Sequence, residues 1–408
     1  MDVSLKTERT SLSGEIGVTG SKSESNRLLL LQALYPQISI SNLSNSEDTQ
    51  VLQKALRSSE DLIDIHHAGT AMRFLTAYYA SREGREVILT GSRRMQQRPV
   101  RVLVTALRDL GADIAYEKEE GVPPLRIRGK HLPKREVTVD ANISSQYISA
   151  LMLIAPSLPE GLRIVLRGQV TSVPYIRMTL ALLEKCGIQG SFEKGVITVP
   201  PTESIKPVNI AVESDWSSAS YFYSLAAMGQ EAEIRLSSYK QESVQGDSRV
   251  AEIYRHFGVA TKYEDDRIVL TRTSGKKTRQ LSLDLADCPD LAQTIAVTCL
   301  GLGISCDLTG LHTLAIKETD RLRALKAEIE KFGGKVQIDS RSLYFRPGGA
   351  LSQGVSVDTY QDHRMALAFA PLALKVPLVI RESEVVVKSF PGFWEVLSGL
   401  GFSVEQSH

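Results

Sequence analysis

Basic side chains stand at or near the starts of predicted helices along the whole chain. They are Lys22, Arg27, Arg73, Arg98, Lys317, Arg321, His363, Arg364 and Lys388. A cation at a helix N-terminus opposes the helix dipole and costs about 0.3–1 kcal/mol unless an anion is present. Arginine offers paired N–H donors to carboxylate or phosphate, and lysine adds a compact charge. The set predicts a site for a strongly anionic ligand, although any one member alone is typical of a solvated surface cation.

The segment from Gly20 to Arg27, G-S-K-S-E-S-N-R, is the first of these helix starts. A glycine turn precedes Lys22 and an apolar helix follows, so backbone N–H groups and two cations converge there. The Walker A loop needs Lys directly after Gly, and Ser21 interrupts that order, which argues against nucleotide binding. A capped helix with solvated Lys and Arg side chains is the alternative for this segment.

Two acids accompany the cations. Asp290 follows Pro289, a position at which Asp ordinarily caps a helix. Glu318 lies one turn before Arg321, where a surface ion pair is the ordinary role. In a cationic site, one acid can serve as general base and the other as general acid. Uncharged donors suited to phosphate and hydroxyl groups are Ser144, Ser145, Gln146, Ser172 and Tyr175.

The composition is that of a globular α/β protein. With 408 residues, 42% hydrophobic and 23% charged, the chain is long enough for two domains, and its net charge of +1 gives no general attraction to nucleic acid or membranes. The first ten residues are polar and no apolar run approaches the roughly 18 residues that span a bilayer, so we expect a cytoplasmic protein. The four cysteines lack metal-site or disulfide spacing, which predicts buried thiols and no metal or organic cofactor.

A pattern of a polar cluster followed by a helix of small and apolar residues returns six times. The copies begin at Ser21, Ala68, Ser144, Asp215, Pro289 and Gln361, separated by 47, 76, 71, 74 and 72 residues. Amphipathic helices that end in glycine alternate with them, as in A-L-R-D-L-G to Gly111, and short strands such as 125–128 follow. We expect each repeat to hold one inner helix, one outer helix and about four strands.

Six repeats suit two domains of three. We place the first domain at 20–212, and the second at 1–19 together with 213–408, with the seam in the Pro-containing segment 200–212. If the inner helices of a domain run parallel, their N-termini point the same way and their dipoles add. Two such domains facing each other would form an anion-attracting cleft, which is where we expect the active site.

Ten stretches of the chain together resemble the 5-enolpyruvylshikimate-3-phosphate synthase family. They are G-S-K-S-E-S-N-R, A-G-T-A-M-R, Q-R-P-V, I-S-S-Q-Y, S-V-P-Y-I, D-W-S-S-A-S, P-D-L-A-Q-T-I-A, I-K-E-T-D-R, Q-D-H-R-M-A and V-K-S-F-P-G-F. They follow the family order over nearly the whole chain. The resemblance implies a two-domain inverted half-barrel in which each domain has three βαβαββ units.

The resemblance also implies the reaction, a step of the shikimate pathway of aromatic amino-acid biosynthesis. The enolpyruvyl group of phosphoenolpyruvate is transferred to the 5-hydroxyl of shikimate 3-phosphate by addition and elimination, and phosphate is released. Both substrates are polyanions. No nucleic acid, membrane or cofactor takes part, and we expect a monomer.

Site residues follow by similarity to the same family. The phosphoenolpyruvate site matches Lys22, Gly69, Thr70, Arg98, Gln146, Arg321, Arg364 and Lys388. The shikimate 3-phosphate site matches Lys22, Ser23, Arg27, Ser144, Ser145, Ser172, Asp290 and Lys317, with Thr313 at a further contact position where many relatives have Asn. Asp290 is expected to take the hydroxyl proton and Glu318 to protonate the methylene carbon. Lys22, His363 and Lys388 complete the expected catalytic set.

Two other functions compete with this interpretation. The sister enolpyruvyl transferase that acts on UDP-N-acetylglucosamine typically has Lys-Asn in the first loop and an early reactive cysteine. Here Ser23 follows Lys22 and the earliest cysteine is Cys186. A non-catalytic protein that binds a phosphorylated metabolite is the second alternative. The presence of both Asp290 and Glu318 argues against it, because binding alone does not favour carboxylates beside anions.

Overall fold

The computed structural model describes residues 1–140, 145–168, 170, 173–273 and 278–407. The chain divides into two compact units, Gly20–Val212, which we call the continuous unit, and Met1–Thr19 with Glu213–His408, which we call the discontinuous unit. Within the described ranges no helix has both the length and the apolar character needed to cross a membrane.

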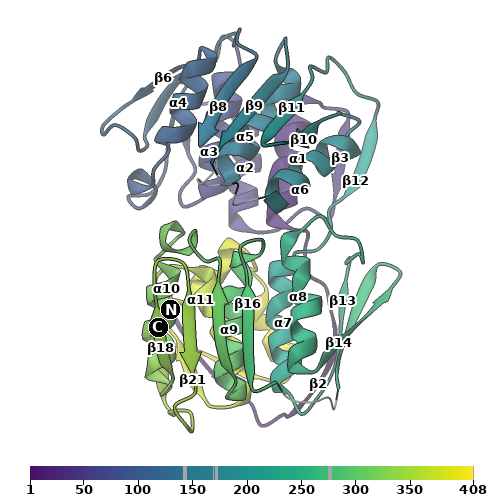
Figure 1. Ribbon diagram of the computed structural model, residues 1–408, viewed down its shortest axis with the longest axis vertical. Helices are drawn as coiled ribbons and strands as arrows, with labels where there is room; N and C mark the ends of the chain where they lie inside the picture. The colour runs from purple at the N-terminus through teal and green to yellow at the C-terminus, as the bar shows by residue number, and fades with distance from the viewer. Residues whose placement is uncertain (141–144, 169, 171–172, 274–277, 408) are drawn as a thin grey trace. The chain divides into compact units, whose positions relative to one another are not determined.

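The continuous unit is built around three inner helices, α1, α3 and α5, which pack against one another (Figure 1). Its helices are α1 (Lys22–Leu34), α2 (Glu47–Arg57), α3 (Gly69–Ala80), α4 (Arg101–Leu110), α5 (Ser145–Ile154) and α6 (Val173–Lys185). Its strands are β3 (Ile38–Ser41), β4 (Leu62–Asp64), β5 (Glu86–Thr90), β6 (Asp113–Tyr116), β7 (Leu125–Arg128), β8 (Glu136–Asp140), β9 (Leu162–Arg167), β10 (Ser191–Glu193), β11 (Val196–Val199) and β12 (Val208–Ala211). Every residue of α3 except Thr70 is buried, as the run of small and apolar residues predicts.

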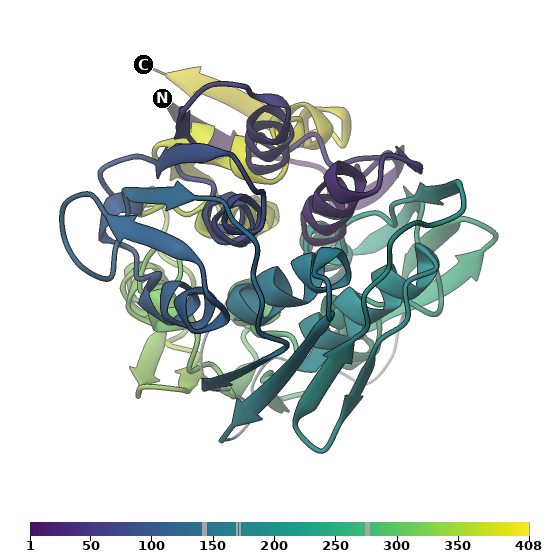
Figure 2. The same ribbon diagram turned by 90° about the horizontal axis from the view of Figure 1, so that it is seen from above.

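The discontinuous unit repeats this plan around α7, α9 and α11. Its helices are α7 (Trp216–Met228), α8 (Val250–Ile253), α9 (Ala292–Leu302), α10 (Arg321–Lys331), α11 (His363–Phe369) and α12 (Phe393–Gly399). Its strands are β1 (Asp2–Lys6), β2 (Ser11–Ile16), β13 (Glu231–Ser237), β14 (Val259–Glu264), β15 (Arg267–Arg272), β16 (Gln280–Asp284), β17 (Ser305–Thr309), β18 (Lys335–Ile338), β19 (Leu343–Arg346), β20 (Val355–Val357), β21 (Leu378–Ile380) and β22 (Ser403–Ser407). The two chain ends lie side by side, because β1 pairs antiparallel with β22 (Figures 1 and 2).

In the part of the chain that the structure describes, six sheets accompany the six inner helices. The discontinuous unit has the strand orders β20-β21-β1-β22, β14-β15-β13-β2 and β16-β17-β19-β18, and the continuous unit has β4-β5-β7-β6, β10-β11-β9-β8 and the two-stranded β12-β3. The expectation of about four strands for every repeat is therefore wrong for one sheet. Its strand β3 belongs to the first repeat, which is only 47 residues long and lacks the chain length for more.

The outer helices end as their sequences predict. The chain turns from helix to strand at glycines with positive φ, namely Gly111, Gly187, Gly258, Gly333 and Gly401. At Gly111, φ is 112°, and the backbone N–H bonds back to carbonyls of the last helical turn, which completes a left-handed cap. These caps return the chain toward the sheets and leave the N-terminal ends of the inner helices to carry the polar clusters.

Candidate active site

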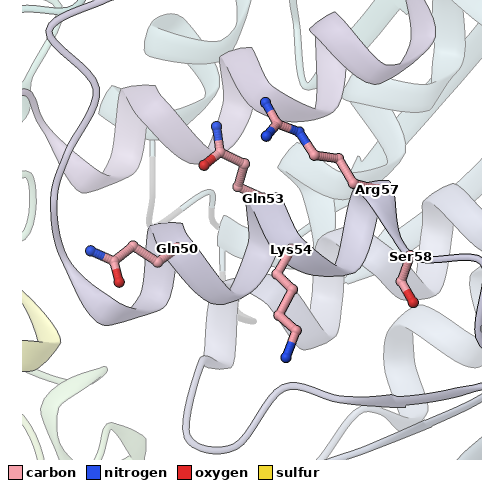
Figure 3. A pocket seen from close by; sticks show the side chains of 5 residues that line it. All are labelled: Gln50, Gln53, Lys54, Arg57 and Ser58. Atoms are coloured by element: carbon pink, nitrogen blue, oxygen red, sulfur yellow. The ribbon is translucent and has the colours of Figure 1, made fainter.

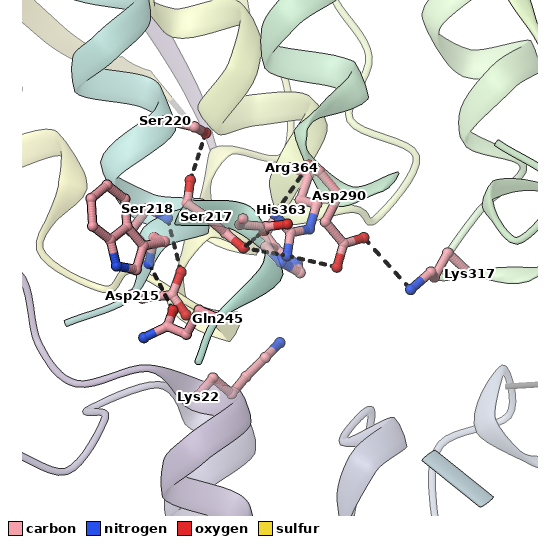
Figure 4. A network of polar contacts seen from close by, with 12 residues as sticks. Lys22, Asp215, Ser217, Ser218, Ser220, Gln245, Asp290, Lys317, His363 and Arg364 are labelled. Carbon is pink, nitrogen blue, oxygen red and sulfur yellow. Dashed lines mark hydrogen bonds and ion pairs between the residues drawn. The ribbon is translucent and has the colours of Figure 1, made fainter. Parts of the chain in front are cut away.

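Asp290 is the centre of a charged cluster in the discontinuous unit (Figure 4). It lies in a short 3₁₀ helix, η5 (Pro289–Leu291), just before α9. Its carboxylate is 2.8 Å from Nη1 of Arg321, 3.2 Å from Nη2 of Arg364 and 3.5 Å from Nζ of Lys317. The residue at the N-cap of α9 is Leu291. The Asp290 side chain therefore binds cations and does not cap that helix.

Arg321 holds three carboxylates at once. At the first position of α10, its Nη1 binds Asp290, its Nη2 binds Glu318 at 2.7 Å, and its Nε binds Asp362 at 2.6 Å. The Arg321 side chain is 2% exposed and that of Asp362 is fully buried. The guanidinium geometry explains why arginine occupies this position, since its nitrogens point in several fixed directions in one plane.

The electrostatics of the cluster fix the charge of both partners. Burial alone raises the pKa of Asp290, but Arg364, Lys317 and Arg321 together hold it well below its usual range. Burial likewise lowers the pKa of Arg321, and the attraction of Asp362, Glu318 and Asp290 exceeds that effect and raises it. Asp290 is thus a carboxylate at neutral pH. Three carboxylates and the three cations Lys317, Arg321 and Arg364 leave the cluster close to neutral.

A fourth acid reaches the cluster through a serine. Nη2 of Arg364 donates to Ser217 Oγ at 3.2 Å (Figure 4). The hydroxyl of Ser217 in turn donates to Asp247. Burial, and next the charge of Asp290, raise the pKa of Asp247 to about 6, against the opposing effect of Arg364. Arg364 therefore contacts Asp290 directly and Asp247 through one hydroxyl.

Three other residues predicted for this unit are His363, Lys388 and Thr313. His363 is the buried first residue of α11, with Nδ1 3.9 Å from Asp362. Lys388 ends the 3₁₀ helix η8 (Ser383–Lys388), and its Nζ donates to the carbonyl of Gln361 at 2.8 Å. Thr313 Oγ1 is buried and has no hydrogen-bond partner in the described part of the chain. A buried hydroxyl of that kind has bonding capacity left for a ligand.

The continuous unit holds its cations differently, as Arg27 on α1 shows. Nε donates to Thr179 Oγ1 at 2.9 Å and Nη2 to Ser149 Oγ at 2.8 Å, and Nη1 donates to the carbonyl of Ser23. The guanidinium also lies 5.6 Å from the ring centroid of Tyr175. Burial lowers the pKa of Arg27 to about 10. The bonding oxygens are neutral, and the nearby charge of Glu24 offsets part of the burial effect on this cation.

A second group forms at the start of α3. Gly69 is its first residue, and a Cβ there would lie 2.5 Å from Nη1 of Arg98 and 3.1 Å from Nη1 of Arg73. Only glycine leaves room for two guanidiniums at this helix N-terminus. Beside it, Gln146 Nε2 donates to Thr70 Oγ1 at 3.1 Å and so links α5 to α3.

The remaining predicted residues have simpler surroundings. Lys22 is the first residue of α1 and its Nζ is 3.4 Å from Asp48. Ser145 begins α5. The predictions for Ser144 and Ser172 fall outside the described residues.

Sequence reasoning named Asp290 and Glu318 but not the other acids and hydroxyls that hold the cations. These are Asp48, Ser149, Thr179, Ser217, Asp247 and Asp362. Asp362 had a readable signal, because it precedes the small-residue helix α11 and its side chain accepts from the N–H of Arg364 as an N-cap. The others act over long sequence separations that no local pattern records.

A metal centre and a surface pocket are two other kinds of site that the chain could hold. No group of His, Cys, Asp and Glu among the described residues has the arrangement of a metal site. An open pocket of about 420 Å³ lies on α2 and is lined by Gln50, Gln53, Lys54, Arg57 and Ser58 (Figure 3). It contains none of the residues predicted from the sequence, and its lining offers two cations but no acid.

Comparisons with known proteins show which family the chain belongs to. The sequence profile of EPSP synthase (3-phosphoshikimate 1-carboxyvinyltransferase) matches residues 53–397. The 3-phosphoshikimate 1-carboxyvinyltransferase of Bacteroides fragilis is 46% identical over 394 residues, which cover 96% of each chain. The chain belongs to the EPSP synthase family. The enzyme of the same name from Vibrio campbellii is 34% identical and covers 95% of this chain and 97% of its own.

The EPSP synthase fold is shown by solved structures as well. EPSP synthase from Acinetobacter baumannii superposes with a TM-score of 0.81 at 20% identity and covers 99% of this chain and all of its own. The enolpyruvyl transferase NikO from Streptomyces tendae gives a TM-score of 0.74 at 13% identity, with 100% and 98% covered. The α/β fold with six repeats that the sequence predicts is therefore confirmed.

Proposed function

We propose that this chain transfers the enolpyruvyl group of phosphoenolpyruvate to the 5-hydroxyl of shikimate 3-phosphate, with Asp290 and Glu318 as the groups that move protons. One observation carries the assignment of the site: both carboxylates sit on nitrogens of a single buried guanidinium, that of Arg321. Membership in the EPSP synthase family supplies the reaction class. An anion-binding site without chemistry gains nothing from two acids beside its cations.

The proposed addition step forms one bond and moves two protons. The 5-hydroxyl oxygen bonds to C2 of phosphoenolpyruvate as the C2=C3 π bond opens, and the hydroxyl proton goes to Asp290. Glu318, which takes up a proton when the substrates bind, delivers that proton to C3. In the elimination, Glu318 takes a proton back from C3, the C2=C3 π bond forms again, and the C2–O bond to phosphate breaks. The proton on Asp290 leaves with the phosphate, and both acids return to their starting states.

The depressed pKa of Asp290 is compatible with a base that binding switches on. Without substrate, Arg364, Lys317 and Arg321 stabilise the carboxylate and make it a weak base. When phosphate and carboxylate groups of the substrates pair with these cations, their field at Asp290 is partly cancelled and its pKa rises. The base then becomes stronger only in the complex that needs it.

Binding roles in the proposal follow the chemistry of each group. Arg321, Arg364, Lys388, Arg98, Gln146, Thr70, Gly69 and Lys22 bind phosphoenolpyruvate, and Lys317, Asp290, Arg27, Lys22, Ser23, Ser144, Ser145, Ser172, Tyr175 and Thr313 bind shikimate 3-phosphate. Lys22 serves both substrates, and His363 supports the catalytic set. The buried oxygens around Arg27 and the close approach of Arg98 to Gly69 support these roles. We also propose a cytoplasmic monomer.

A phosphate-release assay tests the proposal. Phosphate should appear with phosphoenolpyruvate and shikimate 3-phosphate together, and with neither alone. Turnover with UDP-N-acetylglucosamine in place of shikimate 3-phosphate would favour the sister transferase, and tight binding without turnover would favour a non-catalytic protein.

Matched variants then test the acids. Asp290→Asn and Glu318→Gln should each lower turnover by orders of magnitude and leave much of the substrate binding intact. Glu330→Gln, which neutralises an exposed acid of α10, should retain the wild-type rate. Near-normal turnover in either of the first two variants would show that the proton-transfer roles are misassigned.

A further inference from the structure

The turn that precedes α11 has an unfavourable backbone. Tyr360 and Gln361 have φ of 54° and 56°, so two successive residues with side chains are in the left-handed region. Among the described residues this is the one place where two positive-φ residues other than glycine are adjacent. An aromatic residue rarely adopts this conformation, and it persists only where surrounding contacts hold it.

Contacts that hold this turn come from Glu328 on α10. The side chain of Glu328 is fully buried, and its Oε1 accepts from the hydroxyl of Tyr360 at 2.6 Å. Its Oε2 accepts from Lys331 Nζ at 2.6 Å and from the backbone N–H of Asp358 at 3.1 Å. A buried carboxylate with three donors is firmly placed, so it can fix the partner that reaches it. We call Glu328 and Tyr360 the clamp.

Three cations of the candidate site depend on this turn. Lys388 donates to the carbonyl of Gln361 at 2.8 Å. The next residue, Asp362, accepts from Arg321 Nε and from the backbone N–H of Arg364 at 2.9 Å. All three cations belong to the set proposed to bind phosphoenolpyruvate. The set proposed for shikimate 3-phosphate is linked to this turn indirectly, through the contacts of Asp290 with Arg321 and Arg364.

From this geometry we infer that Glu328 and Tyr360 are positioning residues for phosphoenolpyruvate binding, acting through the strained turn 360–361. Because α10 carries Arg321 at its start and Glu328 two turns later, one helix fixes both the guanidinium and the turn whose Asp362 orients it. The inference deepens the proposed function and rests on it for the identity of the ligand.

Tyr360→Phe is the direct test, because it removes only the hydroxyl. In the phosphate-release assay we expect KM for phosphoenolpyruvate to rise about tenfold, with KM for shikimate 3-phosphate and kcat within about twofold of wild type. Tyr344→Phe, which removes a hydroxyl from β19 of the same unit, is the matched control and should change neither KM. An unchanged KM for phosphoenolpyruvate, or an equal rise in both KM values, would overturn the inference.

A rescue variant separates positioning from a general loss of structure. Gly adopts the left-handed region without strain, so Gln361→Gly should lower the need for the clamp. In the Tyr360→Phe, Gln361→Gly double variant, we expect KM for phosphoenolpyruvate to return most of the way to the wild-type value. Failure of Gln361→Gly to improve that KM would contradict the role of strain. Glu328→Gln gives a second route: its effect and that of Tyr360→Phe should not add in the double variant, since they break one contact chain.

The outcome is separable from that of the proposed function. Wild-type turnover with both substrates decides the function by itself. The positioning role is read from variant-to-wild-type ratios and also from calorimetric binding of phosphoenolpyruvate, which requires no turnover. A wild-type chain that binds phosphoenolpyruvate without turnover, together with a tenfold weaker Tyr360→Phe, would keep the clamp and reject the reaction.

Discussion

Arg27 and Arg321 are both buried guanidiniums at predicted anion sites, one in each unit, and their pKa values move in opposite directions. Burial lowers the pKa of Arg27 to about 10, since the oxygens it binds belong to hydroxyls and a carbonyl. The pKa of Arg321 rises, because Asp362, Glu318 and Asp290 outweigh the same burial effect. In the continuous unit the electrostatic effects of Tyr175 and Glu24 offset burial only in part, whereas in the discontinuous unit three acids more than offset it.

The largest expected difference between the two sites is in stability. Arg321→Met leaves three carboxylates, two of them buried, without their shared partner, and removing one member of a buried ion pair costs about 3–5 kcal/mol. Arg27→Met leaves only hydroxyls and a carbonyl with one fewer donor, and we expect a loss of about 1 kcal/mol or less. Urea unfolding followed by tryptophan fluorescence measures the first variant well, because Trp216 and Trp394 both lie in the discontinuous unit.

Far-UV circular dichroism provides the matching measurement for Arg27→Met, since the continuous unit contains no tryptophan. Arg321→Lys is the control for charge, and it should fall between wild type and Arg321→Met, because a single ammonium cannot reach three carboxylates in fixed directions. If Arg27→Met proved the more destabilising of the two methionine variants, the contrast between a guanidinium paired with carboxylates and one bonded to neutral oxygens would be wrong.

The second prediction concerns substrate binding by the continuous unit. Gly69→Ala places a methyl group 2.5 Å from the present position of Arg98 Nη1, which forces that guanidinium away from the start of α3. We expect KM for phosphoenolpyruvate to rise by about tenfold or more, with a small change in unfolding free energy, since the far end of a flexible side chain can move. Steady-state kinetics and urea unfolding check the two parts.

Gly17→Ala supplies the control for that experiment, because a Cβ at Gly17 meets no atom within 4 Å. Its KM for phosphoenolpyruvate should equal that of the wild type. Equal KM values in Gly69→Ala and wild type would mean that Arg98 does not bind substrate from its position beside Gly69.

The sequence predicts much of this architecture because its signals are local. Polar clusters before small-residue helices mark the six repeats and glycines after amphipathic helices mark five of them, and Gly111 and Gly258 take the left-handed φ that these patterns require. The cations were found for the same reason. Apart from Asp290 and Glu318, their partners were not, since Arg321 and Asp362 lie 41 residues apart and Arg27 and Thr179 lie 152 apart. An Asp before a helix also caps it whether or not it holds an arginine, so local pattern cannot distinguish the two roles.

The third prediction concerns Asp247, the fourth acid of the cluster. Burial and Asp290 raise the pKa of Asp247 from 3.8 to about 6, so the folded state binds this proton more tightly than the unfolded state does. The contribution of Asp247 to stability is therefore greatest below pH 3.8 and falls as pH rises toward 6. Asp247→Asn lacks that dependence. Its unfolding free energy should therefore increase, relative to that of the wild type, by about 1–3 kcal/mol as pH rises from 3.8 to 6.

Urea unfolding of both proteins at pH 4.5, 5.5 and 7 measures the difference, in which groups common to the two chains largely cancel. Ser217→Ala is the companion variant, because it removes the hydroxyl that hydrogen-bonds to Asp247 and should raise the pKa of Asp247 further. A difference that stays constant with pH would show that Asp247 carries no raised pKa.

The smallest expected effect is a difference in thiol reactivity between the units. All four cysteines are buried free thiols, and burial raises the pKa of Cys186 in the continuous unit to about 11 and that of Cys288 in the discontinuous unit to about 12. The charge of Asp247 adds to the effect at Cys288, so the acidic cluster makes this thiol the harder one to ionise. Since the thiolate is the reactive form, iodoacetamide should label neither residue at pH 8 and should reach Cys186 first as pH increases. Mass spectrometry of peptides from the labelled native protein decides the order. Earlier labelling of Cys288 would mean that the nearby acids do not raise the pKa of its thiol.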